Sequence, residues 1–561
     1  ALTKSSRTDG SDLGSLLARF FKVLDSEKAS RPAKMPEELR ELPYVNGELF
    51  KEDLGFADFD GPMRDALIAA CEFNWSRISP AVFGSLFQSI MAGEAGARKR
   101  RQIGAHYTSE RDIMKLVRSL FLDDLKAELE ACGKDKKKLQ AFQDRLAGLR
   151  FLDPACGCGN FLVVTYRELR LLELEALLRL HTAPKKGGEA RGIQTVLNID
   201  QFLKVTVDQM HGIEIEEWPA RIAEVAMWLI DHQMNQMVGE AFGVPVLRLP
   251  LKKSAKIAVE NALRIDWGDV LPAKQCAYVL GNPPFVGAMW MSAAQHDDLE
   301  GVAGGAKGIG VLDYVAGWYF KAAAYTKGKT IRCAFVSTNS ITQGEQVGIL
   351  WEPLFRDYGL KIHFGHRTFS WMSEARGKAH VHVVIIGFGA SDVPNKRIYD
   401  YEDGEDTAAV TPAGNISPYL FDGPDLFLRN RGAPLCAVPA MVCGSMPRDG
   451  GNLILTAEER KALISRDPEA KKWIKGYLGA EEFLNGNGRF CLWLVNCPPA
   501  TMRAMPSVLE RVEAVRKMRL ASKAGTTRKL AESPGIFAQI AHRESSYLFV
   551  PYVSSERRAY I

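Results

Sequence analysis

The feature that most limits the fold is a regular alternation of short apolar runs with longer helical patterns between residues 104 and 390. The runs are short enough to be buried strands, and they read RFLD, MHGIEI, YVLGN, CAFVSTN and HVVIIGFG. Between them stand segments with apolar residues at helical spacing, such as NFLVVTYRELRLLELEALLRL and WPARIAEVAMWLIDHQM. This order predicts an α/β fold with a mainly parallel sheet and helices on both faces.

The rest of the chain divides around this segment, because 561 residues are too many for one hydrophobic core. Residues 1–100 predict a helical connector domain, from patterns such as LGSLLARFFKVL and AVFGSLFQSIM. The α/β domain is expected over 101–390, a polar linker over 391–430, and a mixed α+β domain over 431–561.

Composition excludes several classes of protein. With 46% hydrophobic and 25% charged residues, the chain has no apolar stretch long enough to span a bilayer. Its first residues lack the pattern of a secretory signal. The ten cysteines form no C-x-x-C pair, which is typical of reduced thiols rather than a zinc site. We therefore expect a soluble, cytoplasmic protein without a metal.

Positive charge gathers near the C-terminus. Residues 501–561 hold eleven Lys or Arg against five Glu, a local charge of +6, whereas the whole chain carries +5. This distribution favours a polyanion as partner. A solvated surface explains the same charges equally well.

The segment LRFLDPACGCGNFLVV, residues 149–164, has the order strand, glycine-rich turn, helix start. In α/β folds this order places a nucleotide-like ligand at the carboxyl end of the strand, and Gly157 and Gly159 would let the backbone approach it closely. Asp153 would repel a phosphate but suits an ammonium group, such as that of S-adenosylmethionine. A glycine turn of this kind also occurs as a purely structural feature.

Two further acids follow strand-like segments. Glu214, in GIEIEEW, is placed to accept hydrogen bonds from ribose hydroxyls, and Asp269, in DWGDVL, could serve the adenine amino group of the cofactor. A glutamate at the surface is the alternative interpretation of Glu214. Together with Asp153 the two acids support a cofactor site.

The segment YVLGNPPFVG, residues 278–287, ends an apolar run with an amide, two prolines and an aromatic ring. An adenine amino group is a poor nucleophile because its lone pair is delocalised into the ring. The Asn282 side chain and the Pro283 carbonyl can accept both amino hydrogens in a stiff loop, and Phe285 can stack on an extruded base. A proline turn that ends a strand is the alternative. No cysteine nucleophile is needed, so Cys156 and Cys158 read as packing residues.

These motifs resemble the γ-class N6-adenine DNA methyltransferases. FLDPACGCGNFL resembles their cofactor motif, GNPPF their catalytic motif, and GAHYTSERDIMKLV (104–117) the segment that precedes the fold. The resemblance implies a Rossmann-like, class I S-adenosylmethionine-dependent methyltransferase core. It implies catalysis by Asn282, Pro283, Pro284 and Phe285, and cofactor binding by His106, Tyr107, Thr108, Asp153, Ala155, Gly157, Gly159, Asn160, Phe161, Glu214 and Asp269.

A second resemblance covers almost the entire chain. LPYVNGELF, FNWSRISPAVFGSLFQSIM, SWMSEARGKAHVHVVIIGF, GSMPRDGGNLILT and VPYVSSERRAYI resemble the single-chain type IIL restriction-modification enzymes, the MmeI-like group. It implies a helical connector, a methyltransferase domain, a target recognition domain and double-stranded DNA as partner. By the same comparison Phe369 is a second stacking ring for the base, with Trp371 as a competing candidate.

The chain also departs from this group. Family members commonly begin with a nuclease domain that bears a D…E-x-K metal site, and the first hundred residues show no such arrangement. We therefore expect no DNA cleavage by this chain. A nuclease domain that was removed, one on a separate chain and the absence of any nuclease are all open alternatives. The final SSERRAYI stops early, so the recognition domain is expected to be incomplete. Cys158 replaces a common Ser, a change that the small side chain makes tolerable.

The sequence thus predicts a site-specific DNA methyltransferase that flips adenine and methylates N6, as part of a restriction-modification or related phage-defence system. Phosphate contacts are expected from Arg98, Lys99, Arg100 and Arg101, although such residues are also ordinary surface. Two alternatives remain. The same loop could methylate RNA or a protein glutamine, or the chain could be a non-catalytic DNA-specificity subunit. Recognition sequence and oligomeric state do not follow from the sequence.

Overall fold

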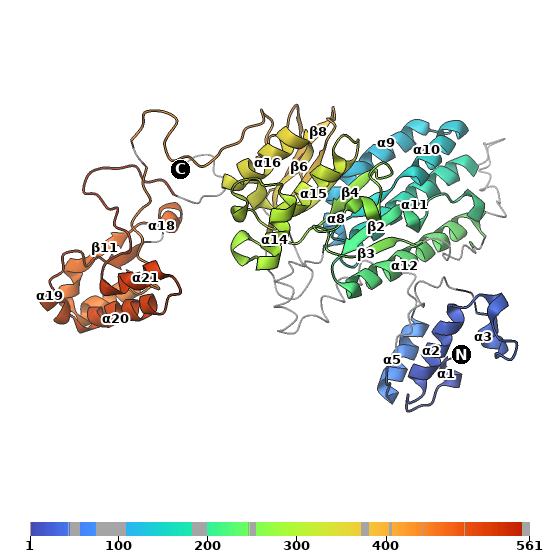
Figure 1. Cartoon of the computed structure of the whole chain (residues 1–561), viewed down its shortest axis with the longest axis horizontal. Helices are drawn as coiled ribbons and strands as arrows, with labels where there is room; N and C mark the ends of the chain where they lie inside the picture. The colour runs from blue at the N-terminus through green and yellow to red at the C-terminus, as the bar shows by residue number, and fades with distance from the viewer. Residues whose placement is uncertain are drawn as a thin grey trace, which may run out of the picture. The chain divides into compact units, whose positions relative to one another are not determined.

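The chain consists of two compact units, residues 1–430 (unit 1) and 431–561 (unit 2) (Figure 1). Each unit has its own buried hydrophobic core. The computed structural model describes residues 2–42, 44, 57–73, 108–181, 199–244, 246, 254–371, 381–402, 407–439, 441–486 and 488–551.

Unit 1 begins with short helices, which are α1 (Leu2–Ser5), α2 (Leu13–Leu24), α3 (Glu37–Arg40) and α5 (Gly61–Glu72). Helix α2 coincides with the predicted pattern LGSLLARFFKVL, and its buried residues include Leu13 and Val23. The Asp60 side chain caps α5 by accepting a hydrogen bond from the Met63 N–H. The second predicted pattern, AVFGSLFQSIM, lies outside the described residues.

A nine-stranded sheet forms the centre of unit 1, in the order β3-β2-β1-β4-β5-β7-β6-β8-β9. Neighbouring strands are parallel from β3 to β5 and between β6 and β8, and the other neighbours are antiparallel. The prediction of a mainly parallel sheet is confirmed. The strands are β1 (Phe151–Asp153), β2 (Met210–Glu214), β3 (Lys256–Val259), β4 (Tyr278–Gly281), β5 (Arg332–Thr338), β6 (Lys361–Trp371), β7 (Val381–Gly389), β8 (Lys396–Asp400) and β9 (Ala409–Ala413).

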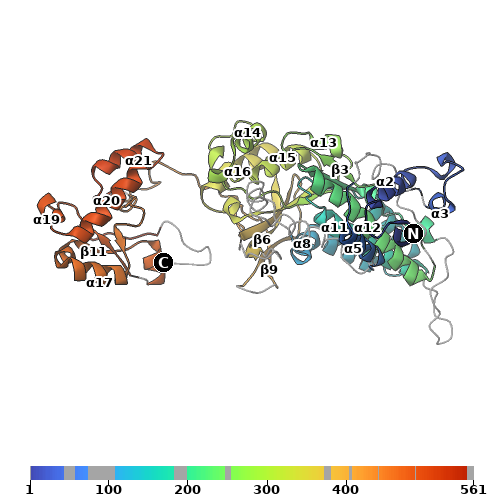
Figure 2. The ribbon, with the colours of Figure 1, turned by 90° about the horizontal axis from the view of Figure 1, so that it is seen from below.

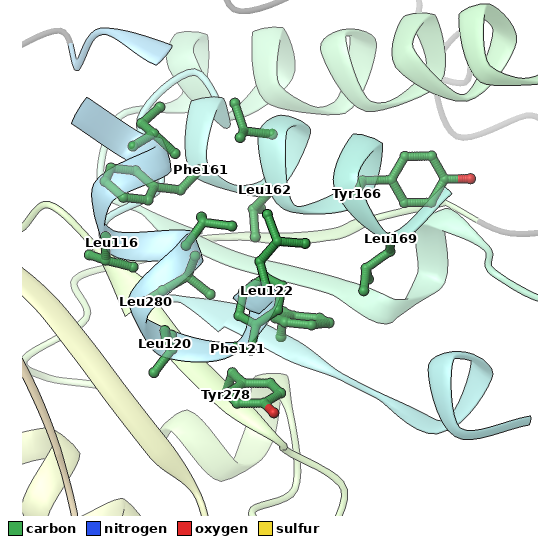
Figure 3. Packing of buried hydrophobic residues seen from close by; sticks show 14 of the residues in the cluster. Leu116, Leu120, Phe121, Leu122, Phe161, Leu162, Tyr166, Leu169, Tyr278 and Leu280 are labelled. Carbon is green, nitrogen blue, oxygen red and sulfur yellow. The ribbon is translucent and has the colours of Figure 1, made fainter. Parts of the chain in front are cut away.

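Helices cover both faces of this sheet. Alternate side chains of β4 illustrate the two layers, because Tyr278 and Leu280 join one buried cluster and Val279 joins the other. Figure 3 shows part of the first cluster, and in Figure 2 the helices of the second lie along the upper side of unit 1. The first face carries α8 (Glu110–Val117), the π-helical turn η3 (Arg118–Leu122), α9 (Asp123–Cys132), α10 (Lys136–Gly148), α11 (Asn160–His181) and α12 (Glu217–Phe242).

The second face carries four helices, of which α13 is a single turn. Their buried aromatic residues, among them Trp267, Tyr319 and Trp351, pack against the sheet. Although α11 and α12 are long, no helix in the described part of the chain is apolar enough over a sufficient length to cross a membrane. The helices of this face are α13 (Trp267–Val270), α14 (Ala293–Val302), α15 (Ala316–Thr326) and α16 (Gly344–Tyr358).

The segment predicted to be a linker, 391–430, contributes two strands to the sheet. β8 pairs with β6, and β9 pairs with β8 at the sheet edge. Ile398 is buried in the second cluster, whereas the β9 residues from Ala409 to Pro412 are exposed. The polar residues that favoured a linker belong in part to the edge strand β9. An edge strand tolerates polar residues because one of its sides faces solvent. The predicted domain boundaries otherwise stay predictions.

Unit 2 is a small α+β fold. Its antiparallel sheet has the order β10 (Ile454–Leu455), β12 (Arg489–Leu492), β11 (Ile474–Tyr477). The core includes Leu455, Leu492 and Val508. The mixed content agrees with the expectation for this segment. The helices are α17 (Ala457–Arg466), α18 (Ala480–Asn485), α19 (Pro499–Arg503), α20 (Pro506–Leu520) and α21 (Gly525–Lys529).

Candidate active site

The carboxyl ends of three neighbouring strands bring the predicted polar residues to one edge of the sheet. β1 lies between β2 and β4, so the strand order reverses beside β1. In open α/β sheets, ligands bind outside the carboxyl ends of the strands at such a point. Asp153 ends β1, Glu214 ends β2, and Asn282 directly follows β4. The topology therefore unites three residues that are far apart in the sequence.

Asp153 is a fully buried acid with one unused oxygen. Its Oδ1 accepts a hydrogen bond from the Ala155 N–H at 3.0 Å, whereas its Oδ2 has no hydrogen-bond partner among the described residues. Burial, together with the smaller effect of the Glu214 charge, raises the pKa of Asp153 to about 8. A Cβ at Gly281 would lie 2.5 Å from Oδ1, so only glycine fits there. A buried carboxyl group whose second oxygen has no hydrogen-bond partner suits a positively charged group of a ligand.

The two turn glycines serve different purposes. Gly157 has φ of 53°, and a Cβ there would meet nothing within 4 Å, so it borders open space that a ligand can approach. Gly159 has φ of 82°, and a Cβ there would lie 2.9 Å from the Cβ of Ala223 on α12. Gly159 is therefore required by helix packing, whereas the sequence suggested ligand approach for both positions.

Glu214 closes the glycine turn from the neighbouring strand. Its Oε2 accepts from the Gly157 N–H at 2.9 Å and its Oε1 from the Glu216 N–H at 3.0 Å. Burial raises the pKa of Glu214, and these backbone donors offset part of that shift. Each carboxylate oxygen keeps a lone pair with which it can accept a hydroxyl. The contact of Glu214 to a ribose stays a prediction.

The remaining predicted cofactor residues differ from one another in burial and in hydrogen bonding. Ala155 is partly buried in the turn, and the Oδ1 of Asn160 is buried without a partner in the described structure. Phe161 is a core residue of α11 that packs in the first cluster (Figure 3). Asp269 is exposed on α13, which packs beside β2, and no described hydrogen bond joins its carboxylate to Asp153.

Asn282 presents an unused acceptor beside Asp153. Its Nδ2 donates to the Thr108 Oγ1 at 3.0 Å, and its Oδ1 is buried without a hydrogen-bond partner in the described part of the chain. Pro283 is buried, and Pro284 is partly buried. Because a buried carbonyl without a donor is costly, this atom marks a place where a ligand N–H would be stabilised.

Contacts from α15 and its preceding loop hold this region in place. The Tyr314 N–H donates to the Val286 carbonyl at 2.9 Å, just after the predicted catalytic loop. The Trp318 Nε1–H donates to the Pro154 carbonyl at 2.9 Å, in the turn after β1. The helix α15 and the loop before it therefore support both sides of the site. Trp318 was not singled out from the sequence.

The two predicted stacking rings border the same buried cluster. Phe285 is partly buried against it, and Phe369 on β6, only 6% exposed, is a member. The Lys115 Nζ lies 4.3 Å from the centre of the Phe369 ring, and the Tyr401 ring centre lies 5.0 Å from it. Lys115 and Tyr401 were not singled out from the sequence, because only the fold brings α8 and β6 together.

Several predictions fall outside the described residues. His106, Tyr107 and the basic run Arg98, Lys99, Arg100 and Arg101 are among them, as is the side chain of Trp371. Of the predicted segment 104–117, the structure describes the part from Thr108 onward.

Of the two cysteines beside the site, Cys156 is buried and Cys158 is partly buried. Burial raises the pKa of the Cys158 thiol to about 12 and that of the Cys156 thiol well above its usual value. A Cβ at Gly212 would lie 2.7 Å from the Cys156 Sγ, which is therefore closely packed. Both thiols stay protonated near neutral pH, which agrees with the predicted packing role. Within the described residues, no group of three or more His, Cys, Asp or Glu is placed to hold a metal ion.

Comparisons with known proteins bear on what this site belongs to. Residues 129–400 match the family described as the MmeI DNA-methyltransferase domain, and residues 422–561 match the MmeI target recognition domain. The solved structure of the type IIL restriction-modification enzyme MmeI in complex with DNA is 50% identical to the chain, with a TM-score of 0.84, over 96% of this chain and 70% of that one. The chain belongs to the MmeI family. The resemblance seen in its motifs is thereby confirmed.

A curated relative of this MmeI family member supports the same assignment. DNA methyltransferase A of Bacillus subtilis (strain 168) is 37% identical over 559 residues, which is 99% of this chain and 60% of the relative. The chain thus spans about three-fifths of that protein's length. Asp153, Glu214 and Asn282 all lie in the part that matches the methyltransferase domain.

Proposed function

We propose that this MmeI family member transfers a methyl group from S-adenosylmethionine to N6 of an adenine flipped out of double-stranded DNA, at sites chosen by its recognition domain. The observation that carries the proposal is the buried Oδ1 of Asn282, which lacks a donor in the described structure beside an equally unsatisfied Asp153. Membership of a family with a DNA-methyltransferase domain and a target recognition domain supports the same activity.

The residues at the sheet edge fit S-adenosylmethionine. The open Oδ2 of Asp153 would accept from the ammonium of its methionine part, and Glu214 would accept from its ribose hydroxyls. Gly157, with open space at its Cβ position, would let the backbone approach it. When bound, the cofactor supplies an electrophilic methyl group on a cationic sulfur. Asp269 stays a proposed acceptor for its adenine amino group.

The chain's own contribution to the reaction is to prepare the target amine. Asn282 Oδ1 and the Pro283 carbonyl would accept the two hydrogens of the adenine amino group. Two acceptors at fixed positions favour a localised lone pair on that nitrogen, because the hydrogens are drawn out of the plane of the ring. Phe285 and Phe369 would hold the flipped base by stacking.

A restriction-modification role in the bacterial cytoplasm is part of the proposal. The family relative MmeI is described as a restriction-modification enzyme. The ten cysteines are all unpaired, which is typical of proteins in a reducing compartment.

The test is methylation of mixed-sequence duplex DNA by the full chain with labelled S-adenosylmethionine, followed by mapping of the modified base. We expect N6-methyladenine at one short sequence. Asn282→Ala should lower the turnover rate about 100-fold or more, as loss of a preorganised transition-state contact commonly does. Asn395→Ala is the matched control, because Asn395 is exposed and lies outside the site.

Three results would contradict the proposal. Methyl transfer to RNA or to protein glutamine but not to duplex DNA would support one alternative. Binding of DNA without any methyl transfer would support a specificity subunit. Full methylation by Asn282→Ala would remove the assigned role of the amide.

A further inference from the structure

The hydrogen bond between Thr108 and Asn282 joins the start of α8 to the end of β4, 174 positions apart in the sequence. Thr108 is 4% exposed. The next residue, Ser109, caps α8 by accepting from the Asp112 N–H, and its hydroxyl donates back to Asp112 Oδ2 at 3.0 Å. Asp112 is fully buried and ion-paired with Lys115 at 2.8 Å. Thr108 therefore stands on a well-braced helix end.

An asparagine amide has a donor side and an acceptor side, and only the acceptor side can serve an incoming amine. With Nδ2 bonded to Thr108, the Asn282 Oδ1 remains available. The reverse orientation would offer N–H groups to an amine that itself only has hydrogens to donate. The partner of Nδ2 therefore decides whether the amide can function.

We propose that Thr108 is a positioning residue for Asn282, and that its hydroxyl oxygen holds the amide with Oδ1 toward the target amine. The inference rests on the proposed function and adds a role for a residue that the family resemblance assigned to cofactor binding. The observation behind it is the 3.0 Å hydrogen bond between the buried Thr108 hydroxyl and the partly buried Asn282 side chain.

The hydroxyl proton of Thr108 connects this role with the cofactor. A hydroxyl that accepts one hydrogen bond can still donate its own proton. Asn282 adjoins Gly281, where an added Cβ would lie 2.5 Å from Oδ1 of Asp153. The other oxygen of that carboxyl, Oδ2, is the proposed partner of the methionine ammonium. In an amino acid the carboxylate shares a carbon with that ammonium. If the Thr108 hydroxyl donates its proton to the carboxylate of the cofactor, it can only accept a hydrogen bond from Asn282. The Asn282 amide then cannot exchange the positions of its oxygen and its nitrogen.

Two substitutions separate this role from a cofactor contact. Thr108→Val keeps the shape and removes the hydroxyl, and Thr108→Ser keeps the hydroxyl. We expect Thr108→Val to lower kcat about tenfold or more at saturating cofactor, and Thr108→Ser to stay within about threefold of the wild type. Combined with Asn282→Ala, Thr108→Val should have no further effect, because both act through one amide.

Two readouts besides activity complete the test. Calorimetry with sinefungin, an unreactive analogue of S-adenosylmethionine, measures cofactor affinity, which should change less than kcat. Crystal structures of the full chain with sinefungin should show the Asn282 side chain rotated in Thr108→Val and unchanged in Thr108→Ser. An unrotated Asn282 in Thr108→Val, or a weakened sinefungin affinity with normal kcat, would overturn the positioning role. A wild-type protein without methyltransferase activity would contradict the proposed function only. The crystal structures would still show whether Thr108 positions the Asn282 side chain.

A second, independent observation concerns the turn after the predicted catalytic loop. Met289 is 90% exposed and Trp290 is 81% exposed on the turn η6 (Ala288–Trp290). The Trp290 N–H donates to the Gly287 carbonyl at 2.8 Å, and Ser292 caps the following helix α14. Two large apolar side chains are thus held in solvent by a defined turn, which follows shortly after Asn282 and Phe285 in the chain.

We infer that Met289 and Trp290 enter the gap that the flipped adenine leaves in the duplex. Apolar side chains commonly fill or open base steps in this way, because they replace lost stacking contacts. The inference also rests on the proposed function. A duplex with an abasic target position has such a gap already, so the pair should strengthen binding to it.

The test is a Met289→Ala and Trp290→Ala double variant of the full chain, with Val410→Ala as control because Val410 is exposed on the distant edge strand β9. We expect methylation of a matched duplex to fall about tenfold and a mismatched target to restore it within about threefold. The preference for abasic over intact DNA should be lost. Equal losses on both duplexes, or an unchanged abasic preference, would overturn the inference. The affinity measurement does not require methyl transfer, so it stands even if the proposed activity fails.

Discussion

At the scale of single residues, two buried aspartates show how surroundings decide a role. Asp231 accepts hydrogen bonds from the Tyr166 hydroxyl at 2.5 Å and from Arg170 at 2.8 Å. Asp153 accepts one hydrogen bond from a backbone N–H and keeps an oxygen without a partner in the described structure. The charge of Asp231 is compensated within the fold, whereas the charge of Asp153 requires a ligand.

This difference predicts that Asp153→Asn stabilises the ligand-free chain at high pH. Burial raises the pKa of Asp153 to about 8, so the native carboxyl keeps its proton while the unfolded one loses it near 3.8. Its contribution to stability is complete below pH 4 and is lost as the pH rises to about 8. At pH 9 we expect the free energy of unfolding of Asp153→Asn to exceed that of the wild type by about 3 to 6 kcal/mol, and we expect this variant to bind no sinefungin.

Asp231→Asn is the control for that measurement. It leaves Arg170 with one compensating charge fewer, so we expect this variant to be less stable than the wild type in the same measurement. If Asp153→Asn were the less stable protein at both pH 5 and pH 9, the Asp153 carboxyl would not be the uncompensated charge described above.

At the scale of elements, one buried arginine holds the loops around α20 in unit 2. Arg519 is fully buried and donates to five backbone carbonyls, with no carboxylate among these partners. The carbonyls belong to residues 447–448 and to residues 530–536. The planar guanidinium satisfies several acceptors at once, which an ammonium cannot do.

Arg519→Lys should therefore destabilise unit 2. A lysine has three donors on one atom, so at least two carbonyls would lose their partner, at a cost of about 2 to 4 kcal/mol. Hydrogen exchange measured by mass spectrometry should be faster than in the wild type in the peptides that contain residues 447–448 and 530–536. Arg516→Lys, an exposed change on the same helix, should leave exchange unaltered. Equal exchange in both variants would show that the carbonyls find other donors.

The strands also show how far local patterns predict this fold. The five apolar runs correspond to β1, β2, β4, β5 and β7. β6 and β8 were missed because they contain buried polar residues that only the tertiary structure satisfies. His366 on β6, for example, is bonded to Ser119 and Tyr401. β3 was missed because it is an edge strand with exposed ends at Lys256 and Val259.

At the scale of the whole molecule, the domain match and the compact units divide the chain slightly differently. The match to the recognition domain starts at residue 422, whereas unit 2 starts at residue 431. Residues 422–430 are held by two ion pairs within unit 1. Lys361 donates to Asp425 at 3.0 Å, and Arg429 donates to Glu352 at 2.6 Å. The recognition domain is thus joined to a segment anchored on the methyltransferase sheet, while the basic residues of 501–561 lie in unit 2.

The sequence by itself determined the family, the alternation of strands and helices, and the candidates Asp153, Glu214 and Asn282, because these depend on local spacing and on residue chemistry. The tertiary structure decided which distant side chains meet. It placed the Thr108 hydroxyl in a hydrogen bond with the Asn282 amide and the Lys115 ammonium over the Phe369 ring. It also packed Ala223 of α12 against Gly159. Such contacts depend on how elements pack across the sheet, and local periodicity determines only which face of an element is buried.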